Sequence, residues 1–215
     1  MIDPRLVLYH FPDACSQVSV CALNQSGLAY TLELVNLAAN AQSSETFLKL
    51  SPMGKVPTLL IDSDPLTENA AVLTFIAALR PDAGLFPSDP SPRMRADIVG
   101  GLAFCGGTLH PQIRGLANPS RLTTGDVAPV REKSADLAKK SFGYAEHRLE
   151  ERGWWLGVES IIDVYLNWAV SVARKSGFEM AAYPSLDGLV NRLNERPAFA
   201  QMIEGEVAAR KALGL

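Results

Sequence analysis

The stretch Leu50-Ser51-Pro52-Met53-Gly54-Lys55-Val56-Pro57-Thr58-Leu59-Leu60-Ile61 decides the fold of this chain. It reads as a Pro/Gly turn, a Val-Pro step and an apolar β-strand. A proline at the start of a strand has no N–H to donate, so a backbone edge beside it stays unpaired. A cis Val56-Pro57 bond, for which an X-Pro step needs only about 0.5–1 kcal/mol, would turn the Val56 N–H and C=O towards an extended peptide ligand. The alternative is a proline that only shapes a loop.

The residues around this stretch predict a compact α/β unit over residues 1–81. Apolar or alternating runs predict strands at 6–9, 30–37, 58–61 and, as a short edge strand, 65–66. Helical patterns predict helices at 14–24, 44–49 and 67–79, and Gly27 is expected to stop the first of them. In the last of these helices we expect Thr67 as the N-cap and Glu68 in the first turn, where the helix dipole favours an acid. A right-handed crossover between the first two strands then gives a four-stranded mixed sheet.

The second half of the chain predicts a different architecture. Residues 82–91 are rich in proline and read as a linker, and residues 92–215 contain helical patterns and no strong strand pattern. We expect helices at about 91–114, 127–151, 160–175, 184–195 and 197–213. Ser160-Ile161-Ile162-Asp163 fits a capping box at a helix start, which is a folding device. The second domain is therefore predicted to be all-α.

The composition narrows the function classes. The chain has 215 residues, a formal net charge of −3 and 47% hydrophobic residues, which indicates packed cores and no nucleic-acid binding. No apolar run reaches membrane-spanning length, and Met1–Arg5 lacks a signal-peptide pattern. The cysteines Cys15, Cys21 and Cys105 form no CxxC pair and no metal-ligand spacing. We therefore expect free thiols, no bound metal and a cytoplasmic location.

Three motifs stand in order along the chain: the turn Ser51–Leu59, the run Leu66–Leu73 (LTENAAVL) and, after the linker, the Ser160–Asp163 box. They resemble the N-P-x-G-K-V-P-x-L turn, the L-T-E-S-x-A-I-L run and the S-I-x-D box of the cytosolic glutathione transferase family. The resemblance covers nearly the whole chain. It implies a thioredoxin-like N-terminal domain, an all-helical C-terminal domain, glutathione as co-substrate and a homodimer.

Within that family, Leu8–Gln17 (LYHFPDACSQ) is similar to the L-Y-x-x-P-G-A-C-S-L pattern of the bacterial beta class. Thr108-Leu109-His110 stands where that class carries E-L-H. The chain also departs from the class: Asp13 replaces a glycine, and Asn69 replaces a serine. The Gly100-Gly101 and Gly106-Gly107 pairs and two arginines, Arg114 and Arg121, have no counterpart in the class pattern.

A glutathione site needs backbone partners for the cysteinyl amide, polar groups for the γ-glutamyl end and a way to hold the thiolate. Val56 and Pro57 suit the first need. Glu68 can accept from the γ-glutamyl ammonium group, and Asn69 with the free N–H groups of its helix suits the γ-glutamyl carboxylate. The alternative for Glu68 is an acid favoured only by the helix dipole. Because these parts belong to one tripeptide site, we predict that the Val56-Pro57 bond is cis.

The residue that holds the glutathione thiolate is expected at or near the first turn of the first helix. The candidates are Cys15, Ser16 and Tyr9. Lowering a thiol pKa by about 2 units takes about 2.7 kcal/mol. A hydrogen bond to the thiolate supplies about 1.5–3 kcal/mol, and a helix N-terminus about 0.3–1 kcal/mol more. Ser16 or Tyr9 can be the hydroxyl donor, whereas Cys15 can form a mixed disulfide with glutathione. The alternative for Cys15 is a small core residue.

The remaining candidates rest on the resemblance or on charge. His110 is expected to face the sulfur across the domain cleft; the alternative is a histidine at a helix C-terminus that bonds to its own carbonyls. Lys55, Arg114 and Arg121 can meet the glycyl carboxylate or, for the arginines, an acidic co-substrate; the alternative for each is a solvated side chain. Phe104, which we expect in the core, is not among the site candidates.

The resemblance implies a glutathione transferase of the detoxification type, which adds the glutathione thiolate to a small electrophilic, apolar or aromatic co-substrate. One alternative is a glutathione-dependent thiol-disulfide reductase or peroxidase that uses Cys15 as its nucleophile. A second is a non-catalytic glutathione-binding or scaffold protein. A narrower alternative is the glutathione-dependent cleavage or isomerisation of an aromatic or acidic metabolite.

Overall fold

A computed structural model describes residues 3–215, so Met1 and Ile2 of the N-terminal stretch lie outside the described residues. The chain divides into two compact units. One is the chain up to Leu85 together with Asn194–Leu215, and the other is Phe86–Leu193. The sequence predicts one domain at 1–81, a linker at 82–91 and a second domain at 92–215. The structure differs at the last helix, which groups with the N-terminal unit. No helix within residues 3–215 has the length and apolar character needed to cross a membrane.

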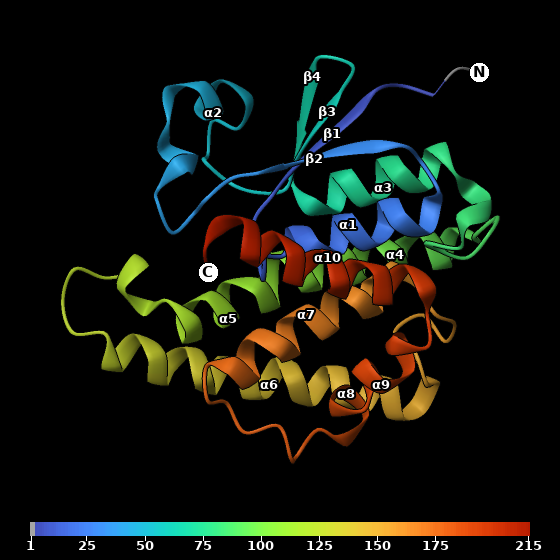
Figure 1. Cartoon of the computed structure of the whole chain (residues 1–215). Coiled ribbons are helices and arrows are strands. Elements are labelled where there is room, and N and C mark those ends of the chain that lie inside the picture. The colour runs from blue at the N-terminus through green and yellow to red at the C-terminus, as the bar shows by residue number, and fades with distance from the viewer. Residues whose placement is uncertain (1–2) are drawn as a thin grey trace. The chain divides into compact units, whose positions relative to one another are not determined.

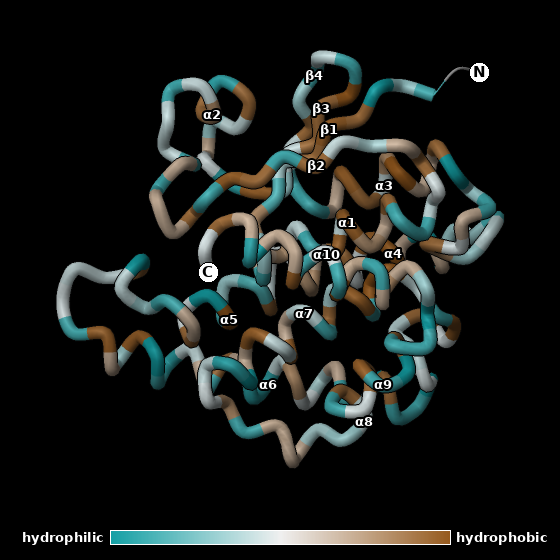
Figure 2. Tube along the Cα trace, viewed as in Figure 1, coloured by the Kyte–Doolittle hydropathy of each residue, from teal (hydrophilic) through white to brown (hydrophobic). Residues whose placement is uncertain are grey.

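A four-stranded mixed sheet forms the centre of the N-terminal unit (Figure 1). Its strands are β1 (Leu6–His10), β2 (Tyr30–Leu34), β3 (Thr58–Ile61) and β4 (Asp64–Thr67), in the order β2-β1-β3-β4. β2 is parallel to β1, whereas β3 is antiparallel to both β1 and β4. Hydrophobic residues gather along β1 and β3, the two central strands (Figure 2). The predicted sheet is therefore confirmed, with β2 shorter than expected.

The helices of this unit are α1 (Ser16–Ser26), α2 (Glu45–Leu50), α3 (Asn69–Leu79) and α10 (Pro197–Leu213), with short 3₁₀ turns at Ala41–Ser43 and Pro81–Ala83. α1 packs against both α3 and α10, and Figure 1 shows the three lying together. Gly27, with φ of 67°, ends α1 in the left-handed conformation that glycine adopts most readily. The first helix thus ends where the sequence predicts.

The start of α3 corrects one prediction. Thr67 was expected to cap this helix, but it lies in β4, paired with Thr58 of β3. Glu68 takes the cap position instead, with φ of 69° and ψ of 120°, so it lies before the first helical turn and not within it. The reason is that hairpin pairing continues to Thr67, and the chain must reverse within one residue to begin α3.

The helical unit contains α4 (Pro92–Ala103), α5 (His110–Ala117), α6 (Ala128–Arg152), α7 (Ile161–Lys175), α8 (Pro184–Asp187) and most of α9 (Leu189–Asn194), with a 3₁₀ turn at Pro119–Arg121. α7 is buried along most of its length and forms the centre of this unit. The predicted capping box at its start is confirmed, because the Ser160 N–H donates to Asp163 Oδ2 at 2.9 Å.

α4 and α5 are joined by a π-helical segment, Phe104–Leu109, so the helix continues past residue 114 to Ala117. Pro111 lies inside this helix, in the first turn of α5. A proline inside a helix removes one N–H and pushes on the carbonyl one turn earlier. The wider π turn directly before it accommodates this disturbance without ending the helix.

Candidate functional site

The Val56-Pro57 bond is cis, as predicted, and Cys15 lies beside it. Cys15 occupies the N-cap position of α1, and its Sγ donates a weak hydrogen bond to the Val56 carbonyl oxygen at 3.7 Å. The Cys15 side chain is 7% exposed. The predicted nucleophile and the predicted peptide-binding edge are therefore in direct contact within one unit.

The backbone around Val56 is held firmly, but the Val56 N–H is not used. The Lys55 carbonyl accepts from Ser51 Oγ and from Thr58 Oγ1, both at 3.0 Å, and the Lys55 N–H donates to Ser51 Oγ at 3.1 Å. Among residues 3–215 the Val56 N–H has no hydrogen-bond acceptor. A fixed loop with a spare main-chain donor suits an extended peptide that needs a backbone partner. The Lys55 side chain is exposed.

Glu68 and Asn69, the predicted γ-glutamyl ligands, differ in their surroundings. Glu68 is exposed at the N-terminus of α3, next to helical N–H groups that favour an anion. Asn69 is buried: it accepts from Ser19 Oγ at 2.6 Å and donates to the Cys15 carbonyl at 3.1 Å. The Asn69 side chain thus joins α3 to the residue that begins α1. Its role towards a ligand stays a prediction.

Ser16 and Tyr9, the two hydroxyl candidates, make other contacts. Ser16 is fully buried, and its Oγ lies 2.8 Å from Nδ1 of His10. The Tyr9 ring packs on Phe47, with 5.6 Å between ring centroids, beside an apolar cluster that includes Val56. Cys15, in contrast, contacts the Val56 carbonyl oxygen. Which of the three side chains meets a glutathione sulfur stays a prediction.

The candidates of the helical unit lie around α5. His110 begins this helix; its Nδ1 is 3.3 Å from Tyr165 Oη, and its ring centroid is 4.5 Å from that of Trp168. It is therefore not a C-terminal histidine bonded to helix carbonyls, because the helix continues through it. Arg114 lies in α5 and Arg121 in the next 3₁₀ turn. The roles of these three residues towards glutathione stay predictions.

Two functional candidates were missed by the sequence interpretation. His10, at the end of β1, lies just beyond the predicted strand 6–9, and Glu206 of α10 carries no motif. The structure brings them together: His10 Nε2 lies 2.9 Å from Glu206 Oε1. Both side chains are buried, at 1% and 4% exposed. No local signal points to this pair, because its members lie at opposite ends of the chain.

The other two cysteines differ from Cys15. Cys21 and Cys105 are each 1% exposed, and neither is in a disulfide. Burial, and then the charge of Asp163, raise the pKa of the Cys105 thiol well above its usual range. A thiol with a raised pKa is a poor nucleophile, whereas a helix N-terminus lowers thiol pKa values. A nucleophilic role for Cys15 stays a prediction.

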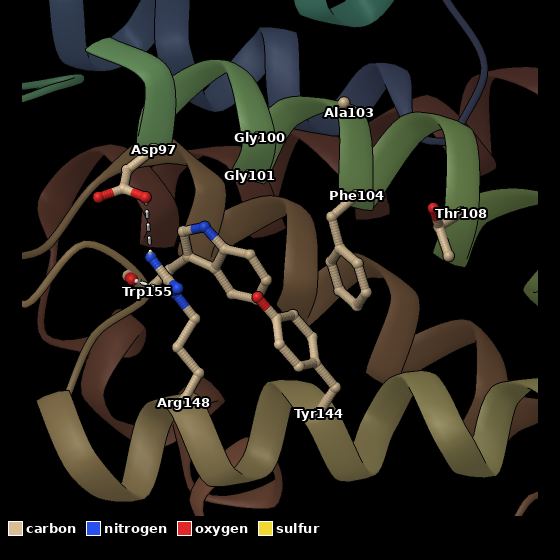
Figure 3. Close-up of a pocket in the computed structure, with 9 residues that line it drawn as sticks. All are labelled: Asp97, Gly100, Gly101, Ala103, Phe104, Thr108, Tyr144, Arg148 and Trp155. Atoms are coloured by element: carbon tan, nitrogen blue, oxygen red, sulfur yellow. Dashed lines mark hydrogen bonds and ion pairs between the residues drawn. The ribbon is translucent and has the colours of Figure 1, made fainter. Parts of the chain in front are cut away.

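The helical unit has a surface pocket of its own, of about 350 Å³ (Figure 3). Phe104, Tyr144 and Trp155 form an aromatic wall, and Arg148 lies over the Trp155 ring at 4.7 Å from its centroid. Phe104, expected in the core, therefore lines a pocket. None of the predicted site residues is among those that line it.

The four-stranded mixed sheet with its helices and the separate helical unit define a thioredoxin-like, two-unit class of protein, and comparison with known proteins identifies the family. Residues 14–79 match the family model described as "Glutathione S-transferase, N-terminal domain". Glutathione S-transferase GST-4.5 of Xanthomonas campestris pv. campestris is 31% identical over 189 residues, which cover 86% of this chain and 91% of the relative. The chain belongs to the glutathione S-transferase family.

Solved structures agree with this assignment. The bacterial beta class glutathione S-transferase of Sphingomonas chungbukensis is 32% identical, with a TM-score of 0.81, over 93% of this chain and 98% of that one. A sphingomonad glutathione S-transferase complexed with glutathione is 31% identical, with a TM-score of 0.82 and the same coverage. The thioredoxin-like and all-helical architecture and the beta-class resemblance read from the sequence are in line with these neighbours.

Proposed function

We propose that this protein is a glutathione transferase that binds glutathione along the Val56 main chain and places its sulfur beside Cys15. The contact between Cys15 Sγ and the Val56 carbonyl, next to an unused Val56 N–H, is the observation that carries the proposal. An extended tripeptide would accept from that N–H and displace the thiol from the carbonyl. Its cysteinyl sulfur would then lie at the N-terminus of α1, next to the Cys15 thiol.

The chemistry at that place is thiolate stabilisation followed by addition. The N-terminus of α1 and one hydrogen bond to the sulfur together supply about 2–4 kcal/mol, which is enough to lower a thiol pKa by about 2 units. The glutathione thiolate then attacks an electrophilic carbon of the co-substrate, forming a C–S bond as the leaving group departs or a proton is taken up. Exposed Glu68 would accept from the γ-glutamyl ammonium group.

Thiol-disulfide exchange is the second candidate, because Cys15 is in direct contact with the proposed peptide edge. The Cys15 thiolate attacks the glutathione sulfur of a mixed disulfide R–S–S–G, giving a Cys15-glutathione disulfide and releasing R–S⁻. A second glutathione thiolate then attacks that disulfide, which releases oxidised glutathione and restores Cys15. Both reactions use the same glutathione pocket.

Further parts of the proposal concern the setting of the enzyme. An apolar or aromatic electrophile as co-substrate, a homodimer, a cytoplasmic location and a role in detoxification follow from the family resemblance. The three free cysteines accord with a reducing compartment. Contacts of His110, Lys55, Arg114 and Arg121 with the substrates belong to this proposal as well.

Replacing Cys15 by alanine tests the site. We expect Cys15→Ala to abolish exchange with a small disulfide and to slow conjugation of a chloronitrobenzene at least tenfold, since one bond to a thiolate is removed. Calorimetric titration should show that glutathione still binds. The control is Cys105→Ala, which removes a buried thiol elsewhere and should leave both activities within about twofold of the wild type.

Two results would contradict the proposal. If Cys15→Ala changes neither reaction, Cys15 is a core residue. If the wild type binds glutathione with an unshifted thiol pKa and conjugates nothing, the protein is a non-catalytic binder. Loss of exchange with unchanged conjugation would assign only the exchange reaction to Cys15.

A further inference from the structure

A polar network, buried at His10, Ser16 and Glu206 and half-exposed at Asp13 and Arg210, joins α10 to the loop that precedes α1. It consists of His10, Asp13, Ser16, Glu206 and Arg210, and we call it the α10 network. Glu206 Oε1 lies 2.9 Å from His10 Nε2, and Glu206 Oε2 accepts from the Asp13 N–H at 2.6 Å. Arg210 donates to Asp13 Oδ2 at 2.9 Å. Glu206 and Arg210, on successive turns of α10, therefore bind the backbone N–H and the side chain of the same loop residue, Asp13.

The hydrogen-bond directions in the network follow from its chemistry. A carboxylate only accepts, so Glu206 takes one hydrogen from the Asp13 N–H and one from His10 Nε2. His10 Nδ1 is then free to accept from the Ser16 hydroxyl, 2.8 Å away. Every polar group of this chain of contacts has a partner, which a buried carboxylate requires.

The order Ser16–His10–Glu206 has the atom connections of a serine hydrolase triad, but the burial excludes that chemistry. The Ser16 side chain is 0% exposed, so no substrate carbonyl can reach its hydroxyl. The α10 network can therefore affect the candidate site only by holding neighbouring residues in position.

What it holds is the short turn that leads into Cys15. Asp13 has φ of 64°, a left-handed conformation that glycine adopts readily and aspartate tolerates. The beta-class pattern has glycine at this position. In this chain Glu206 and Arg210 bind both ends of Asp13, so α10 stabilises a conformation that the residue itself does not favour. Cys15 follows two residues later, at the N-cap of α1.

We propose that α10 is a working part of the glutathione site, with Glu206 and His10 as positioning residues. Glu206 fixes the Asp13 turn directly and through His10 and Ser16, and the turn fixes the Cys15 thiol against the Val56 carbonyl. This inference rests on the proposed function, because it assigns these residues a role in glutathione binding. In the ligand-free protein, the accessibility of the Cys15 thiol therefore depends on α10.

The test compares Glu206→Ala with Glu206→Gln. Alanine removes the carboxylate oxygens that contact the Asp13 N–H and His10 Nε2. We expect KM for glutathione to rise about tenfold, which is the size of effect that follows the loss of a hydrogen bond to a charged group. KM for the electrophile should stay within about twofold. In the ligand-free protein, iodoacetamide should alkylate Cys15 severalfold faster. Both effects should appear at a temperature well below the thermal midpoint of the variant.

Glutamine should restore the network. Its amide oxygen can accept from the Asp13 N–H, while its NH₂ group donates to His10 Nε2 in the other tautomer. His10 Nδ1 then donates to Ser16, whose hydroxyl already lies 3.4 Å from the Phe11 carbonyl oxygen. Glu206→Gln should therefore return KM and the alkylation rate to within about threefold of the wild type. The matched control is Glu204→Gln, an exposed residue of the same helix, which should change neither.

Several outcomes would overturn the inference. One is a Glu206→Ala protein with a lowered thermal midpoint but an unchanged KM for glutathione and an unchanged alkylation rate, because the pair would then be structural only. If Glu206→Ala does not fold, Arg210→Gln removes the half-exposed Asp13 contact alone; unchanged alkylation of Cys15 in that variant also overturns it. Alkylation needs no glutathione, so a wild type that fails to bind glutathione refutes the proposed function separately.

Discussion

Asp163 in the helical unit and Glu206 in the N-terminal unit are both buried carboxylates that accept backbone N–H groups. Asp163 takes its hydrogens from Trp155 and Ser160, eight and three residues earlier. Glu206 takes one of its hydrogens from Asp13, 193 residues earlier. A local carboxylate starts a helix, whereas one that joins distant segments fixes their mutual geometry. The same chemistry thus serves folding in one place and the proposed site in the other.

The largest expected effect concerns Asp163. Asp163→Ala leaves the Trp155 N–H, the Ser160 N–H and the Ser160 hydroxyl without their acceptor. Each buried orphan donor costs about 1–3 kcal/mol, so the free energy of unfolding should fall by about 4 kcal/mol. Urea unfolding followed by circular dichroism measures the loss. The folded fraction should keep the wild-type KM for glutathione, in contrast to Glu206→Ala.

Asp136→Ala is the control for this variant, because Asp136 is an exposed residue whose ion pair with Lys139 lies on the surface. It should change the free energy of unfolding by less than about 0.5 kcal/mol. A loss for Asp163→Ala no larger than that of the control would contradict the folding role assigned to the capping box.

The next effect is the pH dependence that Asp163 contributes to the free energy of unfolding. Burial raises the pKa of Asp163 from the usual 3.8 to about 6, against the opposing effect of its hydrogen bonds to Trp155 and Ser160. The folded protein therefore binds this proton more tightly than the unfolded chain does. The stabilisation from protonated Asp163 is complete below pH 3.8 and is lost as the pH rises through about 6.

The measurement is the difference in free energy of unfolding between the wild type and Asp163→Asn, which cannot titrate. As the pH rises from 4 to 7, that difference should shift against the wild type by about 2 kcal/mol. A difference that stays constant over this range, or shifts in favour of the wild type, would show that the hydrogen bonds outweigh burial at Asp163.

The smallest expected effect concerns Gly101, which packs on the loop that Asp163 holds. A Cβ at this position would lie 2.4 Å from Trp155 Nε1 and 2.7 Å from Ile162 Cδ1. Trp155 and Ile162 are both buried, so the overpacking in Gly101→Ala should lower the free energy of unfolding by about 1–3 kcal/mol.

Gly100→Ala is the matched control. A Cβ at residue 100 meets nothing within 4 Å, and alanine is the better helix former, so this neighbour should be stabilised by up to about 1 kcal/mol. Thermal unfolding of the two variants side by side measures the contrast. Equal effects of the same sign would mean that Trp155 moves aside easily, and that the loop depends on Asp163 alone.

Features with local causes could be predicted from the sequence. Period-two and apolar runs predict the four strands, Gly27 predicts the end of α1, and the Ser160–Asp163 spacing predicts its capping box. The N-cap of α3 was misplaced by one residue, because the pairing of Thr67 with Thr58 is a tertiary effect that outweighs Thr67's preference for a cap.

The candidate site was predictable in part. The cis Val56-Pro57 bond follows from the Ser51–Leu59 motif, whereas the place of Cys15 beside it, 41 residues away in the sequence, follows from the family resemblance. The α10 network could not be found in this way: no spacing rule connects His10 with Glu206. The grouping of α10 with the N-terminal unit likewise depends on packing against α1, which a helical pattern alone does not specify.

A crystal structure of the protein with glutathione tests the central claim most directly. We predict that the cysteinyl residue of the tripeptide pairs with the Val56 N–H and C=O, and that Cys15 Sγ is the protein atom nearest the glutathione sulfur. A sulfur that lies nearest the hydroxyl of Tyr9 or Ser16, or a tripeptide bound away from Val56, would contradict the proposed site.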